Sequence, residues 1–141
     1  MHIDEITNGI VIDHIAAGKS MEIYKLLNLD ALECSVAIIK NVPSKKMGKK
    51  DIIKIDEALD VDLAALGYID NGITINIIEN GVKTRKMHLE LPERIVNIVK
   101  CKNPRCITSV EQEIDHVFKL TDKENKVYRC VYCEMKAKTK E

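Results

Sequence analysis

The chain has 141 residues, 45% of them hydrophobic, and its 22 Lys and Arg residues balance its 22 Asp and Glu residues. This length suits one domain or two small ones, and the balanced charge gives no support for a nucleic-acid or membrane partner. No apolar run approaches the roughly 20 residues of a transmembrane helix, and residues 1–6 carry acidic side chains and no apolar signal segment, so the sequence predicts a cytoplasmic protein.

Short β-rich runs alternate with two helical patterns over the first two thirds of the chain. Strands are expected at residues 10–15, 34–42, 49–55, 73–77 and 82–91, and helices at residues 19–29 and 56–66. Pro43 is expected to end the second strand, and Gly67 to end the second helix. The order strand, helix, strand, strand, helix, strand, strand is close to a ferredoxin-like layout, in which two helices cover one face of an antiparallel sheet.

A break in this pattern at Leu91-Pro92-Glu93-Arg94 predicts a domain boundary. We therefore expect one domain over residues 1–94 and a second over residues 95–141. The sequence ends in a lysine-rich tail at residues 136–141, which is expected to be solvated.

Two close pairs of cysteines follow the boundary, Cys101 with Cys106 and Cys130 with Cys133. Four thiolates favour zinc or an iron–sulfur cluster, and an all-cysteine site leaves no position for water, so the metal should be structural. The alternatives are four ordinary buried thiols and a disulfide or redox pair, and a cytoplasmic compartment disfavours a disulfide. The segment between the pairs fits a small β-meander. The sequence thus predicts an α+β protein with a small all-β, zinc-ribbon-like C-terminal domain that binds one Zn²⁺ and depends on it for folding.

Charged residues also recur in the expected N-terminal strands. Lys50, Ile52 and Lys54 should share one face of a strand because side chains alternate, and by themselves they are explained more simply by a solvated face than by a nucleotide site. Asp13 and His14 are adjacent, so a regular strand would direct them to opposite faces. The sequence contains no nucleophile elbow, P-loop or GxGxxG motif. We therefore expect no enzyme activity from this chain alone.

Specific motifs follow one another along nearly the whole sequence. They are residues 8–15 (NGIVIDHI), 43–44 (PS), 47–55 (MGKKDIIKI), 74–76 (TIN), 91–95 (LPERI), and the two cysteine pairs followed by Glu134. In this order they resemble the regulatory chain of aspartate carbamoyltransferase. The resemblance implies a noncatalytic subunit with an allosteric nucleotide-binding domain and a zinc domain that docks on the catalytic chain, with regulatory-chain homodimers bridging catalytic trimers.

The resemblance also implies roles for individual residues. Asp13 and Lys54 would contact the ribose and base of a nucleotide effector, ATP, CTP or in some members UTP. His14 and Lys86 would face the phosphates, with Lys50 close by, and the remaining contacts would come from Ile6, Ile52 and Asn76. The phosphate lysine could instead be Lys83, and Lys86 is preferred by its distance from Leu91-Pro92. The interface with the catalytic chain would include Asn103, Arg105 and Glu134.

Two other classes of function are possible for such a sequence. A zinc-ribbon module that binds nucleic acid would show strongly salt-dependent binding, and the balanced charge and the VIDHI segment argue against it. A stand-alone enzyme is disfavoured because no catalytic constellation is present. The expected function is therefore allosteric: nucleotide effectors bias an equilibrium between two quaternary states and so tune pyrimidine biosynthesis.

Overall fold

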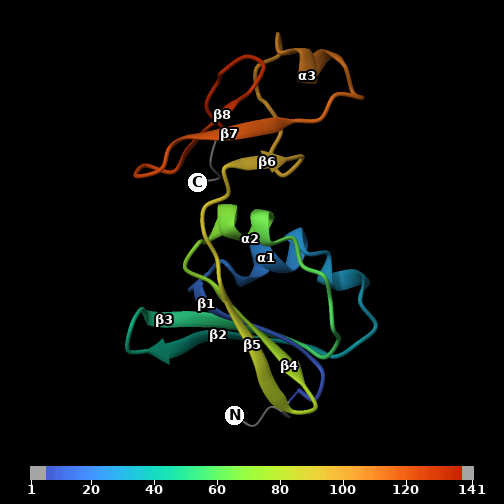
Figure 1. The fold of residues 1–141 in the computed structure, drawn as a ribbon, viewed down its shortest axis with the longest axis vertical. Coiled ribbons are helices and arrows are strands. Elements are labelled where there is room, and N and C mark those ends of the chain that lie inside the picture. The colour runs from blue at the N-terminus through green and yellow to red at the C-terminus, as the bar shows by residue number, and fades with distance from the viewer. Residues whose placement is uncertain (1–5, 138–141) are drawn as a thin grey trace. The chain divides into compact units, whose positions relative to one another are not determined.

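The computed structural model describes residues 6–137 and divides into two compact units between Glu90 and Leu91. The acidic residues at positions 1–5 and the end of the lysine-rich tail, 138–141, lie outside the described residues. Across residues 6–137, no helix is both long enough and apolar enough to cross a membrane. Each unit has its own sheet (Figure 1).

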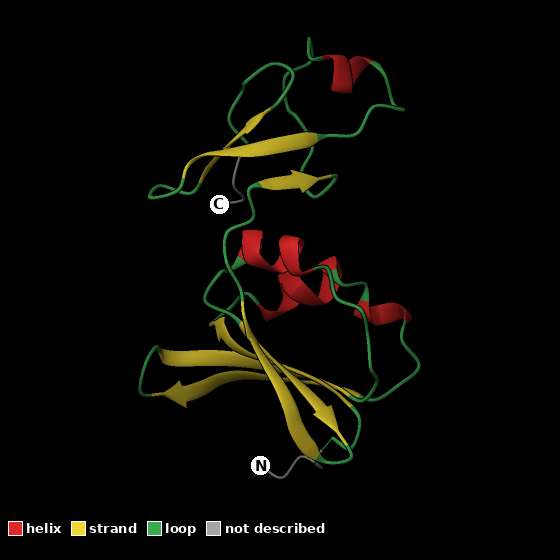
Figure 2. Ribbon diagram, in the orientation of Figure 1, coloured by secondary structure: helices red, strands yellow, loops and turns green. Residues whose placement is uncertain are grey.

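The N-terminal unit is a five-stranded antiparallel sheet in the order β2-β3-β1-β4-β5. Its strands are β1 (Gly9–Ala16), β2 (Val36–Ser44), β3 (Gly48–Ile55), β4 (Thr74–Glu79) and β5 (Val82–His88). Two short helices, α1 (Ser20–Leu26) and α2 (Leu63–Ile69), cover one face of this sheet, and a 3₁₀ turn spans Leu29–Ala31 (Figure 2). The expected ferredoxin-like arrangement is confirmed, because β1 to β4 with the two helices form that unit and β5 extends the sheet beside β4.

The hydrophobic core lies between the sheet and the helices. Ile75, Ile12 and Ile53 are neighbours across β4, β1 and β3, and each is 0% exposed. Ile23 of α1 and Leu66 of α2 belong to the same buried cluster. Burial of each such side chain contributes about 1.5–3 kcal/mol. Because strand side chains alternate, the residues before and after each of these isoleucines along its strand point to the face that no helix covers.

Several element ends differ from the sequence prediction, including those of β2, which covers Val36–Ser44 instead of 34–42, and of β5, which ends at His88 instead of residue 91. Helix α1 ends earlier than expected, and Asn28 beyond it has a left-handed backbone. Helix α2 begins later than expected, because Asp62 caps it by accepting a hydrogen bond from the Ala65 N–H, and it continues through Gly67. Pro43 does not end β2, since β2 is an edge strand, where a missing N–H is tolerated.

The C-terminal unit is a three-stranded antiparallel sheet of β6 (Arg94–Val96), β7 (Val117–Asp122) and β8 (Val127–Cys130). Ile95, Phe118 and Tyr128 are its most buried hydrophobic side chains apart from cysteines, and the Tyr128 hydroxyl donates to the Pro92 carbonyl. The small all-β domain is thus confirmed, with one addition, the short helix α3 (Ile107–Val110). Arg94 pairs with Lys119 and so belongs to this sheet.

Candidate metal centre and effector site

The four cysteines of the C-terminal unit come together in one cluster. Their Sγ atoms all lie within 4.8 Å of one another. Cys101 and Cys106 flank the loop that precedes α3, Cys130 ends β8, and Cys133 lies in the turn that follows. Three of the four are buried and Cys133 is partly buried, so the fold gathers the thiols away from water.

The spacing of the sulfurs fits a metal ion. Cys101 Sγ lies 3.5 Å from Cys133 Sγ, and Cys106 Sγ lies 3.7 Å from Cys130 Sγ. Four thiolates around a tetrahedral Zn²⁺ at about 2.3 Å would be about 3.8 Å apart, whereas disulfide sulfurs are bonded at about 2.0 Å. The donor set therefore fits a bound metal and leaves no open coordination position, which is the arrangement of a structural centre.

The surroundings make the four thiols unequal. Burial raises the pKa of the Cys101 thiol to about 12, and hydrogen bonds with the Cys133 and Cys106 thiols add to this effect. Burial acts in the same direction on Cys106, but hydrogen bonds from Thr108 and with the Cys130 and Cys133 thiols together outweigh it and lower the pKa of Cys106 to about 7. The Cys101 N–H donates to His116 Nδ1 at 3.0 Å, which fixes the start of the first loop.

The residues expected at the effector site lie mainly on the sheet face that the helices leave uncovered. Lys86, Asn76, Val11 and Lys54 form one row across β5, β4, β1 and β3. The alternation expected for β3 is present, because Asp51, Ile53 and Ile55 are buried toward the helices while Lys50, Ile52 and Lys54 are partly exposed. The sheet thus places two lysines and an amide in one row.

Asp13, His14 and Lys50 meet at one end of this face. Lys50 Nζ forms an ion pair with Asp13 Oδ1 at 2.9 Å, and the same oxygen accepts the His14 N–H at 2.6 Å. Burial alone would raise the pKa of Asp13, but the hydrogen bonds from Lys50 and the His14 N–H hold it below its usual value. His14 has a left-handed backbone (φ 59°), and the β1–β3 register shifts between Ile12 and Ile15, so the adjacent pair does not follow a regular strand.

Two polar atoms near this cluster are buried without a protein partner. His14 Nδ1 and Asn76 Oδ1 have no hydrogen-bond partner in the part of the chain that the structure describes. Asn76 is only 6% exposed. Buried polar atoms are nearly always paired, so these two atoms mark the place where a polar ligand would complete the structure.

The two apolar residues expected at the effector site are both partly buried. Ile52 is partly buried and pairs across the sheet with Ile39. Ile6 is partly buried and lies against Gly9, since a Cβ on Gly9 would be 2.9 Å from Ile6 Cγ2. Both are the kind of side chain that packs against a base or sugar.

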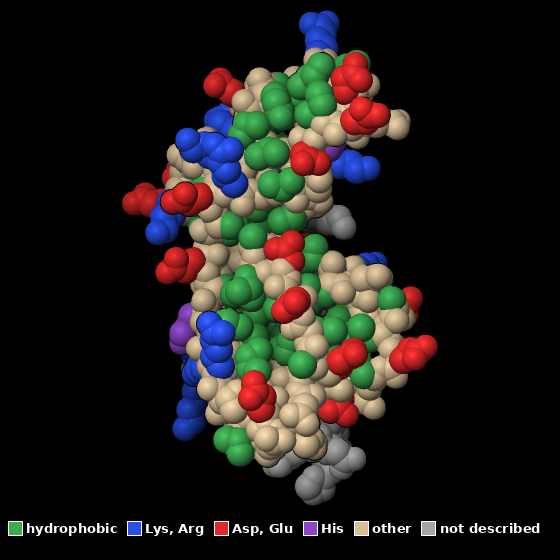
Figure 3. Space-filling view, turned by 45° about the vertical axis from the view of Figure 1, so that its right-hand side comes forward, with side chains coloured by type: hydrophobic (Ala, Val, Ile, Leu, Met, Phe, Trp, Pro, Cys, Tyr) green, Lys and Arg blue, Asp and Glu red, His purple; other side chains and the backbone are tan. Residues whose placement is uncertain are grey.

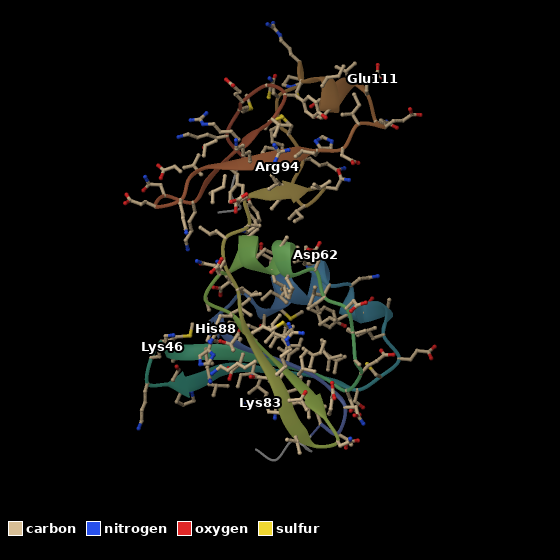
Figure 4. All side chains as sticks on the ribbon, in the orientation of Figure 1. Lys46, Asp62, Lys83, His88, Arg94 and Glu111 are labelled. Carbon is tan, nitrogen blue, oxygen red and sulfur yellow. The ribbon has the colours of Figure 1, made fainter. Side chains whose placement is uncertain are left out.

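Both alternative phosphate lysines lie on β5. Lys86 is directly opposite Asn76, whereas Lys83 is opposite Ile78, beyond a register shift in the β4–β5 pairing. Figure 4 shows Lys83 toward one end of β5 and His88 at the other. Of the two lysines, Lys86 is therefore the one that lies beside Asn76, whose Oδ1 atom has no partner among the described residues.

The expected interface residues lie beside the cysteine cluster. Arg105 and Glu134 are exposed, while Asn103 is half-buried and accepts the Arg105 N–H at its Oδ1. Sequence reasoning missed the exposed apolar side chains on either side of the cysteines, which are Ile107, Val110, Val131 and Tyr132. Figure 3 shows hydrophobic side chains on the surface of this unit. Large apolar residues next to metal ligands were the available signal.

Comparison with known proteins gives the same two-part division. Residues 1–90 match the family described as aspartate carbamoyltransferase regulatory chain, allosteric domain, and residues 93–141 match the metal binding domain of the same chain.

Curated relatives match along nearly their whole length. The aspartate carbamoyltransferase regulatory chain of Clostridium botulinum is 53% identical over 132 residues, which cover 94% of this chain and 90% of the relative. That of Clostridium tetani is 53% identical over 133 residues, covering 94% and 92%. The Bifidobacterium longum chain is 41% identical over 138 residues, covering 98% and 99%. The chain therefore belongs to the family of aspartate carbamoyltransferase regulatory chains.

Proposed function

We propose that this noncatalytic regulatory chain senses ATP, CTP or UTP and tunes pyrimidine biosynthesis through an aspartate carbamoyltransferase catalytic chain. The observation that carries the nucleotide site is the pair of buried, unpartnered atoms, His14 Nδ1 and Asn76 Oδ1, on a sheet face that also holds lysines. A nucleotide supplies donors and acceptors for such atoms and phosphates for the cations.

Each part of the nucleotide has a complementary group on this face. The carboxylate of Asp13 and the ammonium of Lys54 take the ribose and base region. The phosphates are taken by Lys50, Lys86 and His14, since charge-assisted hydrogen bonds to phosphate are the stronger kind. Ile6 and Ile52 give the apolar part of the lining, and Asn76 offers its free oxygen to a donor on the ligand.

The effectors add no chemistry of their own. They bind two quaternary states with different affinity and so shift one equilibrium, with a coupling free energy of roughly 1–3 kcal/mol. Regulatory-chain homodimers that bridge catalytic trimers would make both states common to the whole assembly.

The C-terminal unit supplies the attachment. A structural Zn²⁺ held by Cys101, Cys106, Cys130 and Cys133 would cross-link the two loops that carry them, and four closely packed reduced thiols suit a cytoplasmic protein. Beside these loops, Asn103, Arg105 and Glu134 provide polar groups and the exposed apolar side chains provide contact area for the catalytic chain.

Titration of CTP and ATP into the full chain by calorimetry tests the effector site. Lys54→Ala and Asn76→Ala should each weaken binding by about 10-fold or more, the equivalent of one hydrogen bond to a charged group. Lys25→Ala is the matched control, because Lys25 is exposed on α1 and lies over the opposite face. His14→Ala should weaken binding as well, because His14 would face the phosphates. Unchanged affinity in all three site variants would contradict the assignment.

A further inference from the structure

Thr108 is an unusual residue in the C-terminal unit. Among the described residues of this unit, it is the one buried polar side chain other than the cysteines, with 3% of its surface exposed. A buried hydroxyl without a hydrogen bond costs about 1–3 kcal/mol. The hydrogen-bond partner of the Thr108 hydroxyl therefore helps to explain why this side chain is tolerated in a buried position.

That partner is a sulfur atom of the cysteine cluster. Thr108 Oγ1 lies 3.1 Å from Cys106 Sγ, and both residues belong to the start of α3, where Cys106 is the N-cap. A thiolate that coordinates a metal has no proton to give, so in the metal-bound chain the hydroxyl is the donor and the sulfur the acceptor.

We propose that Thr108 is a positioning residue for the metal centre, whose hydroxyl holds the Cys106 thiolate in place and slows loss of the metal. Four thiolates around a divalent ion leave an excess of negative charge in a buried site, and a hydrogen bond to one sulfur offsets part of it. This inference rests on the proposed metal binding of the four cysteines and adds a residue to it.

Two variants isolate the hydroxyl. Thr108→Ser keeps the hydroxyl and Thr108→Ala removes it, while both variants lose the same methyl group. Thr121→Ala is the matched control on β7, because its hydroxyl is exposed and donates to the Val127 carbonyl, away from the cluster.

The full chain is loaded with Zn²⁺, and the rate of zinc transfer to a colorimetric chelator is measured. Thr108→Ala should release zinc about 10-fold faster than Thr108→Ser, the lower end of the loss in metal affinity when a group that hydrogen-bonds to a metal ligand is removed. The Co²⁺-loaded protein should show a shifted thiolate-to-cobalt absorption band in Thr108→Ala and an unshifted band in Thr108→Ser and Thr121→Ala. Loss of the methyl group alone would affect the Ser and Ala variants alike.

The possible outcomes distinguish a failure of the Thr108 role from a failure of metal binding by the four cysteines. If the wild-type chain takes up neither Zn²⁺ nor Co²⁺, the metal assignment is wrong and this inference with it. If the wild type loads one ion per chain and the Ser and Ala variants have equal release rates and equal cobalt spectra, Thr108 has no such role.

Discussion

At the scale of single residues, Asp51 illustrates how one buried carboxylate can join three segments. Its side chain is 0% exposed and accepts the N–H groups of Gly18 at 3.1 Å, Ser20 at 3.4 Å and Asn41 at 3.0 Å. Burial would raise its pKa, but these hydrogen bonds, led by that of Asn41, lower the pKa below its usual value. The same strand carries Lys50 and Lys54 on its other face, so Asp51 anchors the strand of the candidate effector site.

Asp51→Asn should lower the free energy of unfolding at pH 7 by about 2–3 kcal/mol, because hydrogen bonds to a charged acceptor are replaced by weaker or mismatched ones. The folded pKa lies below the unfolded one, so the stabilisation is complete above the unfolded value of about 3.9 and is lost as pH falls through the folded pKa. Urea unfolding between pH 7 and pH 3 measures both effects. The control Asp60→Asn changes an exposed carboxylate, and a variant of Asp51 with the stability and acid sensitivity of that control would contradict this account.

Other residues show what sequence can and cannot predict. Alternation along β3 was sufficient to place Lys50, Ile52 and Lys54 on one face. The left-handed backbone of His14 could not be predicted, because a non-glycine residue adopts it only when the surrounding structure imposes it. Thr108 was missed for a similar reason, since its partner is a sulfur that only the folded chain brings near.

At the scale of elements, the pairing of β1 with β3 depends on Gly9. A Cβ at this position would lie 2.0 Å from the Ile55 carbonyl oxygen and 3.0 Å from the Glu57 N. Both are backbone atoms, so no side-chain rotation can relieve the overlap.

Gly9→Ala should therefore destabilise the N-terminal unit by about 3 kcal/mol, at the upper end of typical overpacking costs. Gly72→Ala is the control, because its Cβ would meet only the Asp70 side chain at 3.2 Å, and it should cost less than about 1 kcal/mol. Urea unfolding followed by circular dichroism gives both values. Equal stability of the two variants would show that β1 and β3 can move apart at this position without a loss in the free energy of unfolding.

The helices and strands of the N-terminal sheet were predictable in type and order, and their ends were not. Leu59, Leu63 and Leu66 have helical spacing, yet only the part after the Asp62 cap is helical. Pro43 was expected to end β2, but its effect depends on whether the strand is central or at an edge, which local sequence does not encode. The Asp62 cap is a local signal that the leucine spacing obscured, whereas the edge position of β2 is a property of the assembled sheet.

At the scale of the whole molecule, the two units differ in how they are stabilised. The N-terminal unit has a large aliphatic core between sheet and helices. The C-terminal unit has a small sheet with three large buried side chains, Ile95, Phe118 and Tyr128, and the cysteine cluster. A segment of this size rarely folds on hydrophobic burial alone, so metal binding should supply much of its folding free energy.

Removing the metal should consequently uncouple regulation from catalysis. Chelation or Cys101→Ala should unfold the C-terminal unit and prevent assembly with the aspartate carbamoyltransferase catalytic subunit, which would stay active but no longer respond to nucleotides. CTP binding should be largely retained, because the candidate effector residues and the core beneath them lie in the other unit. Native mass spectrometry measures assembly, hydrogen exchange of β6–β8 measures unfolding of the C-terminal unit, and calorimetry measures CTP binding. Cys34→Ala is the matched control, since Cys34 lies outside the cluster. Wild-type assembly by a metal-free chain, or loss of CTP binding along with the metal, would contradict the assignment of assembly to the C-terminal unit and of CTP binding to the N-terminal unit.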